Sequence, residues 1–336
     1  MRQGVPIGVL VYGFGAIGQA IAAATLQKRC LRLVGVVDKA PGLAGKPVAE
    51  FVAGAPAQLR ISPCAGAVAN QGEVQVALHA TGSRLHVVAA QYEELLGFGL
   101  DVISTCEEAC FPVGSEAAAI ASRLDRLCRE KGTRLLGTGV NPGFAMDFWP
   151  LIASAAATSL IGISVRRVLD AGQRREALQR KVGAGLTEQE FLEGLAAGTL
   201  GHVGLANSAH MLAAGLGCNV VTLSESCRPV IAQQELRTPY LAIPPGRVAG
   251  LEQELQAELS SGLKLSLSLL MAVGASPTYD EIQLTHAKRQ TRIVVDGGFH
   301  GDETTAALVV NTILPLRRLP PGYYRMIDLP AFGCAP

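Results

Sequence analysis

Net charge and metal-binding residue pairs are both nearly absent from this sequence. The 336 residues carry a formal charge of +1 at pH 7, which excludes the strongly basic surface that a nucleic-acid-binding domain needs. None of the cysteines stands in a C-x-x-C pair and the histidines are dispersed, so we expect no metal site. Scattered cysteines of this kind are typical of reduced thiols, and we expect a cytoplasmic protein.

Long apolar runs are missing as well. A membrane-spanning helix needs ~20 consecutive apolar residues, and no run outside the N-terminal segment approaches that length. Residues 5–26 resemble a signal peptide in their apolar and Ala-rich character, but their glycine spacing argues against one. We therefore expect no membrane association, and a chain of this length can form two domains with a substantial core.

The sequence does contain a glycine pattern behind a short apolar strand. A strand predicted over residues 7–11 leads into Gly13-Phe14-Gly15-Ala16-Ile17-Gly18, which opens an Ala-rich helix. In such a fingerprint the glycines permit a tight turn, close approach of the backbone to a pyrophosphate, and close packing of the helix on the strand. These six residues are predicted to bind a dinucleotide.

An acidic residue stands where this fingerprint requires one. Asp38 follows a strand predicted over residues 33–37 and lies twenty residues beyond Gly18. A carboxylate there can accept hydrogen bonds from the adenosine ribose hydroxyls, which favours NAD(H); the alternative is an ordinary turn residue. The neighbouring cation Lys39 would offset part of the repulsion between Asp38 and a 2′-phosphate, so NADP(H) stays open as the cofactor.

Strands and helices continue to alternate up to residue 137, which predicts an α/β fold with a doubly wound parallel sheet. Ligands of such sheets bind outside the carboxyl ends of the strands. Asn141, in a rigid turn after the last of these strands, either holds the nicotinamide carboxamide or caps its own turn. The candidate cofactor-binding residues in the loops at these strand ends are Thr81, Gly82, Ser104, Cys106 and Asn141.

Two adjacent carboxylates, Glu107 and Glu108, follow one of these strands. Burying an acid in an apolar cleft costs several kcal/mol unless it is paired or protonated, which favours a functional role for one of them. Successive residues of an extended chain point to opposite sides, so both cannot face a substrate. The alternative is that both are solvated, or that they stabilise the start of a following helix.

The second half of the chain has a different pattern. It predicts an α+β domain with a strand over 161–169 and a helix over 187–197 that begins with a capping box. Later strands over 263–269, 279–286 and 291–295 predict a mostly antiparallel sheet. The basic segment 174–185 is of a kind that usually forms a solvated face. We expect a dinucleotide-binding domain over 1–142, a substrate and dimerisation domain over 143–302, and a C-terminal segment, 303–336, that returns to the first domain.

Several motifs together resemble the family of 2,4-diaminopentanoate dehydrogenases and the related native amine dehydrogenases, which share an architecture with dihydrodipicolinate reductase. The resemblance spans nearly the whole chain. It implies a homodimer that exchanges an amine for a carbonyl reversibly, with a nicotinamide cofactor and ammonia. The motifs are Gly13–Gly18, Ser104–Glu108, Gly137–Asp147, Arg174–Gly185, Gly201–Leu205 and Gly301-Asp302.

The same resemblance implies roles for individual residues. In that family the catalytic acid is a glutamate of the Ser-Thr-Cys-Glu-Glu loop, which corresponds to Glu108 here. A carboxylate suits this role because it can bind an ammonium ion, stabilise a cationic iminium and move protons. Phe144 would line the substrate pocket beside the small Ala145, and Arg174 and His202 would contact the substrate from the second domain.

A carboxylate on the substrate would pair with one of three arginines, Arg166, Arg167 or Arg174. Two other functions stay open. A dihydrodipicolinate-type reductase would share the fold, but its paired-histidine motif and its Asp-x-Pro-Ser-Gly-Thr segment are absent. A nicotinamide-binding sensor would keep the glycine fingerprint and Asp38 yet would not need Glu108. Hydride transfer in the presence of ammonia would exclude the sensor.

Overall fold

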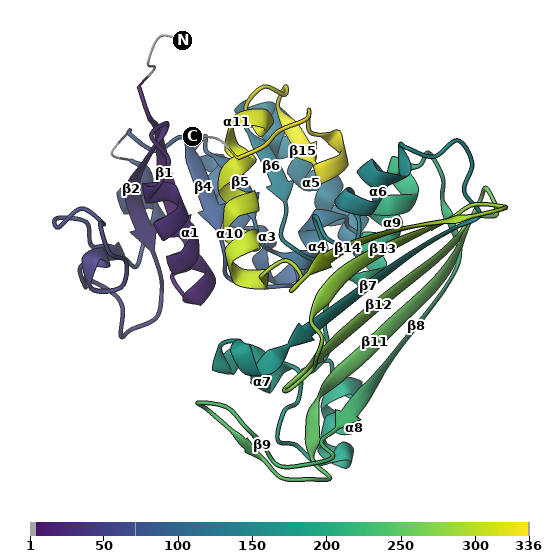
Figure 1. Cartoon of the computed structure of the whole chain (residues 1–336). Helices are drawn as coiled ribbons and strands as arrows, with labels where there is room; N and C mark the ends of the chain where they lie inside the picture. The colour runs from purple at the N-terminus through teal and green to yellow at the C-terminus, as the bar shows by residue number, and fades with distance from the viewer. Residues whose placement is uncertain (1–4, 71, 335–336) are drawn as a thin grey trace. The chain divides into compact units, whose positions relative to one another are not determined.

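The computed structural model describes residues 5–70 and 72–334, and the chain folds as two compact units. The first unit consists of residues 1–144 together with 300–336, and the second of residues 145–299. Figure 1 draws both units, with labels on most of their helices and strands. The chain therefore leaves the first unit once and returns to it.

The first unit is built on a seven-stranded sheet in which all neighbouring strands are parallel, in the order β15-β6-β5-β4-β1-β2-β3. This confirms the predicted doubly wound α/β fold. The strand order reverses between β1 and β4, where open sheets of this type bind their ligands. The strands are β1 (Ile7–Tyr12), β2 (Leu31–Val37), β3 (Ile61–Ser62), β4 (Val76–His79), β5 (Asp101–Ser104), β6 (Arg134–Gly137) and β15 (Gly322–Tyr324).

Helices cover both faces of this sheet. Right-handed crossovers place the helix after β1 and the helices after β4 and β5 on opposite faces, and α1 packs against α10 while α3 packs against α5 (Figure 1). The helices are α1 (Ala16–Leu26), α2 (Ala65–Ala69), α3 (Leu85–Gly97), α4 (Glu107–Cys110), α5 (Ser115–Lys131), α10 (Gly301–Asn311) and α11 (Ile313–Leu316), with 3-10 turns at residues 48–50 and 326–328.

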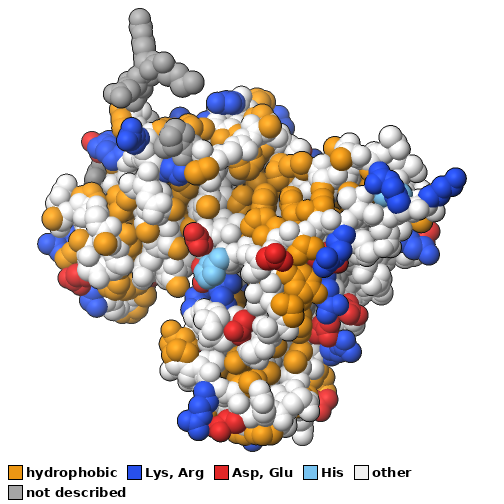
Figure 2. Space-filling model, viewed as in Figure 1, with side chains coloured by type: hydrophobic (Ala, Val, Ile, Leu, Met, Phe, Trp, Pro, Cys, Tyr) orange, Lys and Arg blue, Asp and Glu red, His pale blue; other side chains and the backbone are white. Residues whose placement is uncertain are grey.

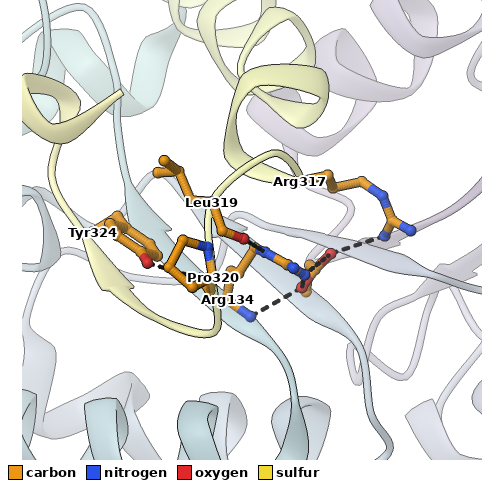
Figure 3. A network of polar contacts seen from close by, with 6 residues as sticks. Arg134, Arg317, Leu319, Pro320 and Tyr324 are labelled. Carbon is orange, nitrogen blue, oxygen red and sulfur yellow. Dashed lines mark hydrogen bonds and ion pairs between the residues drawn. The ribbon is translucent and has the colours of Figure 1, made fainter. Parts of the chain in front are cut away.

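The C-terminal segment is fastened to the sheet by a polar network, drawn in Figure 3. Asp101 is almost fully buried and pairs with Arg134 at 3.1 Å and with Arg317 at 2.8 Å. Arg134 also donates to the carbonyl of Leu319. Strand β15 in this segment was not predicted, and it forms because pairing with β6 satisfies its backbone.

The second unit contains a six-stranded sheet in the order β14-β13-β7-β12-β11-β8. Only the pair β7 and β12 is parallel, so the predicted mostly antiparallel sheet is confirmed. Its two longest strands, β8 and β11, were not predicted. The strands are β7 (Gly162–Asp170), β8 (Val220–Ile231), β11 (Val248–Leu259), β12 (Lys264–Ala272), β13 (Tyr279–Thr285) and β14 (Gln290–Asp296).

One face of this sheet is apolar and the other is half-exposed. On β11 the buried residues alternate with Glu252 and Glu254, and α9 packs against β8, β11 and β12. The predicted capping box between Thr187 and Glu190 is confirmed at the start of α8. The remaining elements are α6 (Phe148–Ser154), α7 (Glu176–Lys181), α8 (Glu188–Ala196), α9 (Leu205–Gly215), β9 (Leu236–Arg237), β10 (Ala242–Ile243) and a 3-10 turn at residues 171–173.

The basic segment 174–185 does not form a solvated face. It contains α7, and Gln179 is fully buried within it. The Gln179 amide donates to the carbonyl of Arg174 at 2.8 Å and accepts from Thr238 at 2.9 Å. The side-chain amide thus ties this segment to the hairpin of β9 and β10, a contact that charge alone does not reveal.

The surface carries charges of both signs. Acidic and basic side chains are interspersed over the face drawn in Figure 2. Among the helices in the described part of the chain, none combines the length and the hydropathy of a membrane span.

Candidate functional site

The glycine-rich turn between β1 and α1 has the geometry that a dinucleotide requires. Gly13 has a φ of +92°, which favours glycine. A Cβ on Gly18 would lie 1.9 Å from the carbonyl oxygen of Gly13, whereas a Cβ on Gly15 would meet no atom within 4 Å. The open space at Gly15 adjoins the first N–H groups of α1, which have no partners inside the helix, so the turn fits a pyrophosphate.

Asp38 is fastened to the same turn. The N–H of Phe14 donates to Asp38 Oδ2 at 2.6 Å, and the N–H of Ala40 donates to Oδ1 at 2.8 Å. The Phe14 ring itself is buried against Phe51. Each carboxylate oxygen keeps a second lone pair, so Asp38 can still accept from ribose hydroxyls. Ala16 and Lys39 are exposed beside it, and Ile17 is half-buried.

Two alanine substitutions in this turn should differ in effect. Gly18→Ala should destabilise the fold by about 1–3 kcal/mol or more, because its methyl group overlaps the backbone of Gly13. Gly15→Ala should leave the unfolding midpoint unchanged and weaken NADH binding roughly tenfold or more, because the methyl group occupies the phosphate space. Urea denaturation and NADH fluorescence titration measure the two effects. Wild-type NADH affinity in folded Gly15→Ala would contradict the assignment.

The loops after β4 and β5 hold the next group of predicted residues. Thr81 is exposed and Gly82 half-buried, whereas Ser104 and Cys106 are both fully buried. Burial raises the pKa of the Cys106 thiol to about 12, so this side chain is a neutral packing group. A cofactor contact at Ser104 or Cys106 would therefore involve backbone atoms.

Glu108 is anchored at the start of α3. Its Oε1 lies 2.7 Å from Arg84 Nη1, and its Oε2 accepts from the N–H of Leu85 at 2.8 Å. Leu85 is the first residue of α3, where a negative charge is favoured. The side chain remains 21% exposed. Glu107, the first residue of α4, is half-buried.

The loop after β6 is tightly turned. Gly143 has a φ of +122°, and a Cβ there would lie 2.5 Å from the backbone nitrogen of Gly139. The N–H of Val140 donates to Thr305 Oγ1 of α10 at 3.1 Å. Asn141 and Phe144 are half-buried in this loop. Ala145, the first residue of the second unit, is fully buried.

The second unit contains a buried ion pair. Arg167 is 1% exposed, and its Nε lies 3.2 Å from Asp280 Oδ1. Both side chains also hold one backbone segment, because Arg167 Nη2 donates to the Phe299 carbonyl at 2.6 Å and Asp280 Oδ2 accepts from the Phe299 N–H at 2.7 Å. Burial raises the pKa of Asp280 and lowers that of Arg167.

Arg174 and His202 lie in the same unit as this pair. Arg174 is 7% exposed, while Arg166 points to the exposed face of the sheet. The backbone of His202 is held on both sides by the Gln253 amide, with both distances at 3.0 Å. Burial, reinforced by the charges of Lys181 and Arg167, lowers the pKa of His202 to about 3. Its imidazole is therefore neutral at neutral pH.

Of the predicted residues, those on the first unit gather at the carboxyl ends of its strands. Sequence reasoning missed the residues that hold them, because no local pattern marks a partner distant in the chain. The predicted residues at these strand ends are Gly13–Gly18, Asp38, Lys39, Thr81, Gly82, Ser104, Cys106, Glu108, Asn141 and Phe144, and the missed ones are His79, Arg84, Gln91 and Tyr92.

Stability should fall as the solution is acidified. Burial lowers the pKa of His79 to about 4 from an ordinary value of 6.5. Between these values the unfolded chain binds a proton that the folded chain does not, so the free energy of unfolding should fall as the pH falls, by roughly 3 kcal/mol from His79. His202, whose pKa is also lowered by burial, should add to this loss. Urea denaturation from pH 7.5 to 4.5 measures this slope. An equally steep slope in His79→Gln would assign the effect to other groups.

Comparisons with known proteins bear on the whole chain. The sequence model described as the 2,4-diaminopentanoate dehydrogenase C-terminal domain matches residues 144–335. The 2,4-diaminopentanoate dehydrogenase of Acetoanaerobium sticklandii is 27% identical over 339 residues, which cover 96% of this chain and 93% of that protein.

Two solved structures share the fold. The amine dehydrogenase from Mycobacterium smegmatis superposes with a TM-score of 0.88 at 21% identity, over 99% of this chain and 98% of that one. A dipicolinate-bound dihydrodipicolinate reductase from Paenisporosarcina sp. TG-14 gives 0.52 at 14% identity, over 96% and 98%. Since the sequence model alone matches more than half of the residues, the chain belongs to the 2,4-diaminopentanoate dehydrogenase family.

Proposed function

We propose that this protein is an NAD(P)-dependent amine dehydrogenase that exchanges an amine for a carbonyl, with ammonia as the second substrate. One observation carries the proposal: in a chain of this family, the carboxylate of Glu108 lies at the carboxyl edge of the sheet whose glycine-rich turn fits a dinucleotide. Neither a sensor nor a ring reductase would need that carboxylate for its chemistry.

The cofactor would be held by the glycine-rich turn and Asp38. We favour NAD(H), because both oxygens of Asp38 are fixed by backbone N–H groups and present their remaining lone pairs to ribose hydroxyls. A 2′-phosphate would meet this negative charge, with Lys39 offsetting part of it. The nicotinamide supplies the hydride acceptor for amine oxidation and the hydride donor for reductive amination.

Glu108 would provide the charge that the reaction needs. Oxidation of an amine produces a cationic iminium, which a fixed carboxylate stabilises. Addition of water and loss of ammonia then require proton transfers that the same carboxylate can perform. Arg84 and the Leu85 N–H hold Glu108 in one orientation, so little reorganisation would be needed when the positive charge forms.

The remaining residues would shape the substrate end. Phe144 and the small Ala145 would set the room beside the reacting carbon, and a neutral His202 would offer a donor and an acceptor. Arg174 would pair with a carboxylate if the substrate is of the 2,4-diaminopentanoate type. A simple alkyl amine would need no such anchor.

The experiment that tests this function follows NADH absorbance with ammonium and a panel of carbonyls, including 2-amino-4-oxopentanoate, at mildly alkaline pH. Oxidation of NADH that requires both ammonium and a carbonyl supports the proposal, and the preferred carbonyl defines the substrate class. Oxidation without ammonium would favour a reductase. NADH binding with no oxidation across the panel would favour a sensor.

We also propose that two copies associate through the half-exposed face of the second unit's sheet. Leu270 lies on this face in β12 opposite Glu252 of β11, and ion pairs such as Arg228 with Glu252 at 2.6 Å lie along it. Light scattering should give the mass of a dimer, and Leu270→Arg should give a monomer by placing a charge in the interface. A monomeric wild-type protein would contradict this proposal.

A further inference from the structure

A chain of buried polar groups lies beneath the loops that follow β4 and β5. His79 is the last residue of β4 and Ser104 the last residue of β5, and both are fully buried. Gln91 and Tyr92 reach them from α3, and Tyr92 is fully buried as well. The chain ends at Thr81, in the loop after β4, where the structure is exposed.

The hydroxyl of Ser104 joins three of these groups. Its Oγ lies 2.6 Å from the Tyr92 hydroxyl, 3.0 Å from His79 Nδ1 and 3.1 Å from the backbone nitrogen of Cys106. The Cys106 N–H can only donate, and a serine hydroxyl has one proton and two lone pairs. All three contacts are hydrogen bonds when the Ser104 hydroxyl accepts from Tyr92 and Cys106 and donates to His79.

The proton positions on the other side then follow. Because Nδ1 of His79 accepts, its Nε2 must carry the proton of a neutral imidazole. Nε2 lies 2.7 Å from Gln91 Oε1 and 2.9 Å from Thr81 Oγ1, and Thr81 donates to Gln91 Oε1 at 2.6 Å. One assignment of protons therefore satisfies the whole chain from Tyr92 to Thr81. This assignment uses a neutral imidazole, which donates from one side and accepts on the other.

This chain connects the two loops that the proposed function uses. The Ser104–Cys106 contact fixes the start of the loop that carries Glu108, and Thr81 lies in the loop after β4. The two loops also meet directly, because the N–H of Glu108 donates to the carbonyl of Ser83 at 3.3 Å. A shift of either loop would thus move the Glu108 carboxylate relative to the strand ends where the nicotinamide would bind.

We propose that His79 is a positioning residue for the reaction, which with Tyr92, Ser104 and Gln91 sets the spacing between the Thr81 loop and the Glu108 loop. The inference rests on the proposed function, since it takes these loops as the nicotinamide end of the site. His79 acts through its neighbours and touches no reacting atom. A change of about 1 Å in such a spacing can reduce turnover on the order of 100-fold.

Two tyrosines provide a matched test. Tyr92→Phe removes the hydroxyl that is hydrogen-bonded to Ser104, whereas Tyr12→Phe removes a buried hydroxyl that takes no part in the chain. Both substitutions keep the ring, including the stacking of Tyr12 on His79 at 5.5 Å. We expect Tyr92→Phe to lower kcat about tenfold and to raise the KM for NADH, as loss of one buried hydrogen bond allows. Tyr12→Phe should leave both within twofold.

Substitutions of His79 give a graded test on the same assay. Glutamine offers one donor and one acceptor, so His79→Gln should retain more activity than His79→Phe, which offers neither. Thermal melting of each variant is measured in parallel. A purely structural role would lower the melting temperature of these variants while leaving kcat and the KM for NADH of the folded protein unchanged, and that result would overturn the proposal.

An NADH titration without substrates separates this inference from the proposed function. If the wild type binds NADH but shows no ammonium-dependent turnover, the proposed function fails. The NADH affinities of the two tyrosine variants still test whether the His79 chain positions the loops. Weaker NADH binding in folded Tyr92→Phe than in Tyr12→Phe then supports a positioning role. Equal affinities in the two variants, or wild-type kinetics in Tyr92→Phe, would overturn it.

Discussion

Replacement of Glu108 by glutamine should reduce ammonium-dependent turnover by ~10²-fold or more, because a neutral amide cannot stabilise an iminium or accept a proton from ammonium. Glutamine has nearly the same shape, so the substitution isolates the charge. The measurement is kcat for the best carbonyl at saturating ammonium and NADH. Turnover within threefold of the wild type would withdraw Glu108 as the catalytic carboxylate.

The anchoring of Glu108 requires two controls. Glu108 also pairs with Arg84 and accepts from the Leu85 N–H, so its loss could act through α3 alone. Arg84→Gln removes the ion pair and keeps the carboxylate, so it should reduce ammonium-dependent turnover much less than Glu108→Gln does. Glu107→Gln, at the neighbouring carboxylate, should also reduce turnover less than Glu108→Gln does. Equal losses in Arg84→Gln and Glu108→Gln would identify Glu108 as an anchor of the helix.

Asp280→Asn should be the most destabilising single substitution proposed for the second unit, at about 3–5 kcal/mol, because it leaves the buried charge of Arg167 without a counter-ion. Asparagine can still accept from the Phe299 N–H, so the loss reports the charge. Urea denaturation measures it. A loss below about 1 kcal/mol, as for surface pairs, would mean that Arg167 has another compensating group.

The neighbouring residue on β13 supplies the matched control. Glu281 pairs with Arg292 at 2.6 Å, and the Arg292 side chain is 63% exposed. Glu281→Gln should therefore cost about 0–1 kcal/mol. Replacing both members of the buried pair by apolar residues, as in Arg167→Met with Asp280→Leu, should recover much of the stability that Asp280→Asn loses, because no unpaired charge remains.

Strands of the first unit were predictable because their buried environment produces a recognisable local sequence pattern. Central strands of a parallel sheet are covered on both faces, so β1 and β4 appear as short continuous apolar runs. Strand β11 of the second unit has no such apolar run. Its apolar Leu251 and Leu255 are four residues apart and are separated by good helix formers, a spacing that suits a helix equally well.

For the candidate site, the sequence by itself determined the elements whose chemistry depends on adjacent residues: the glycine-rich turn, Asp38 after its strand, and the glutamate pair after β5. Only the tertiary structure decided that Glu108 is held by Arg84 and that His79 joins Ser104, which lies 25 residues away. The physical reason is that turns and strands are set by interactions between near neighbours, whereas buried polar groups take whichever partner the paired strands bring within hydrogen-bond distance.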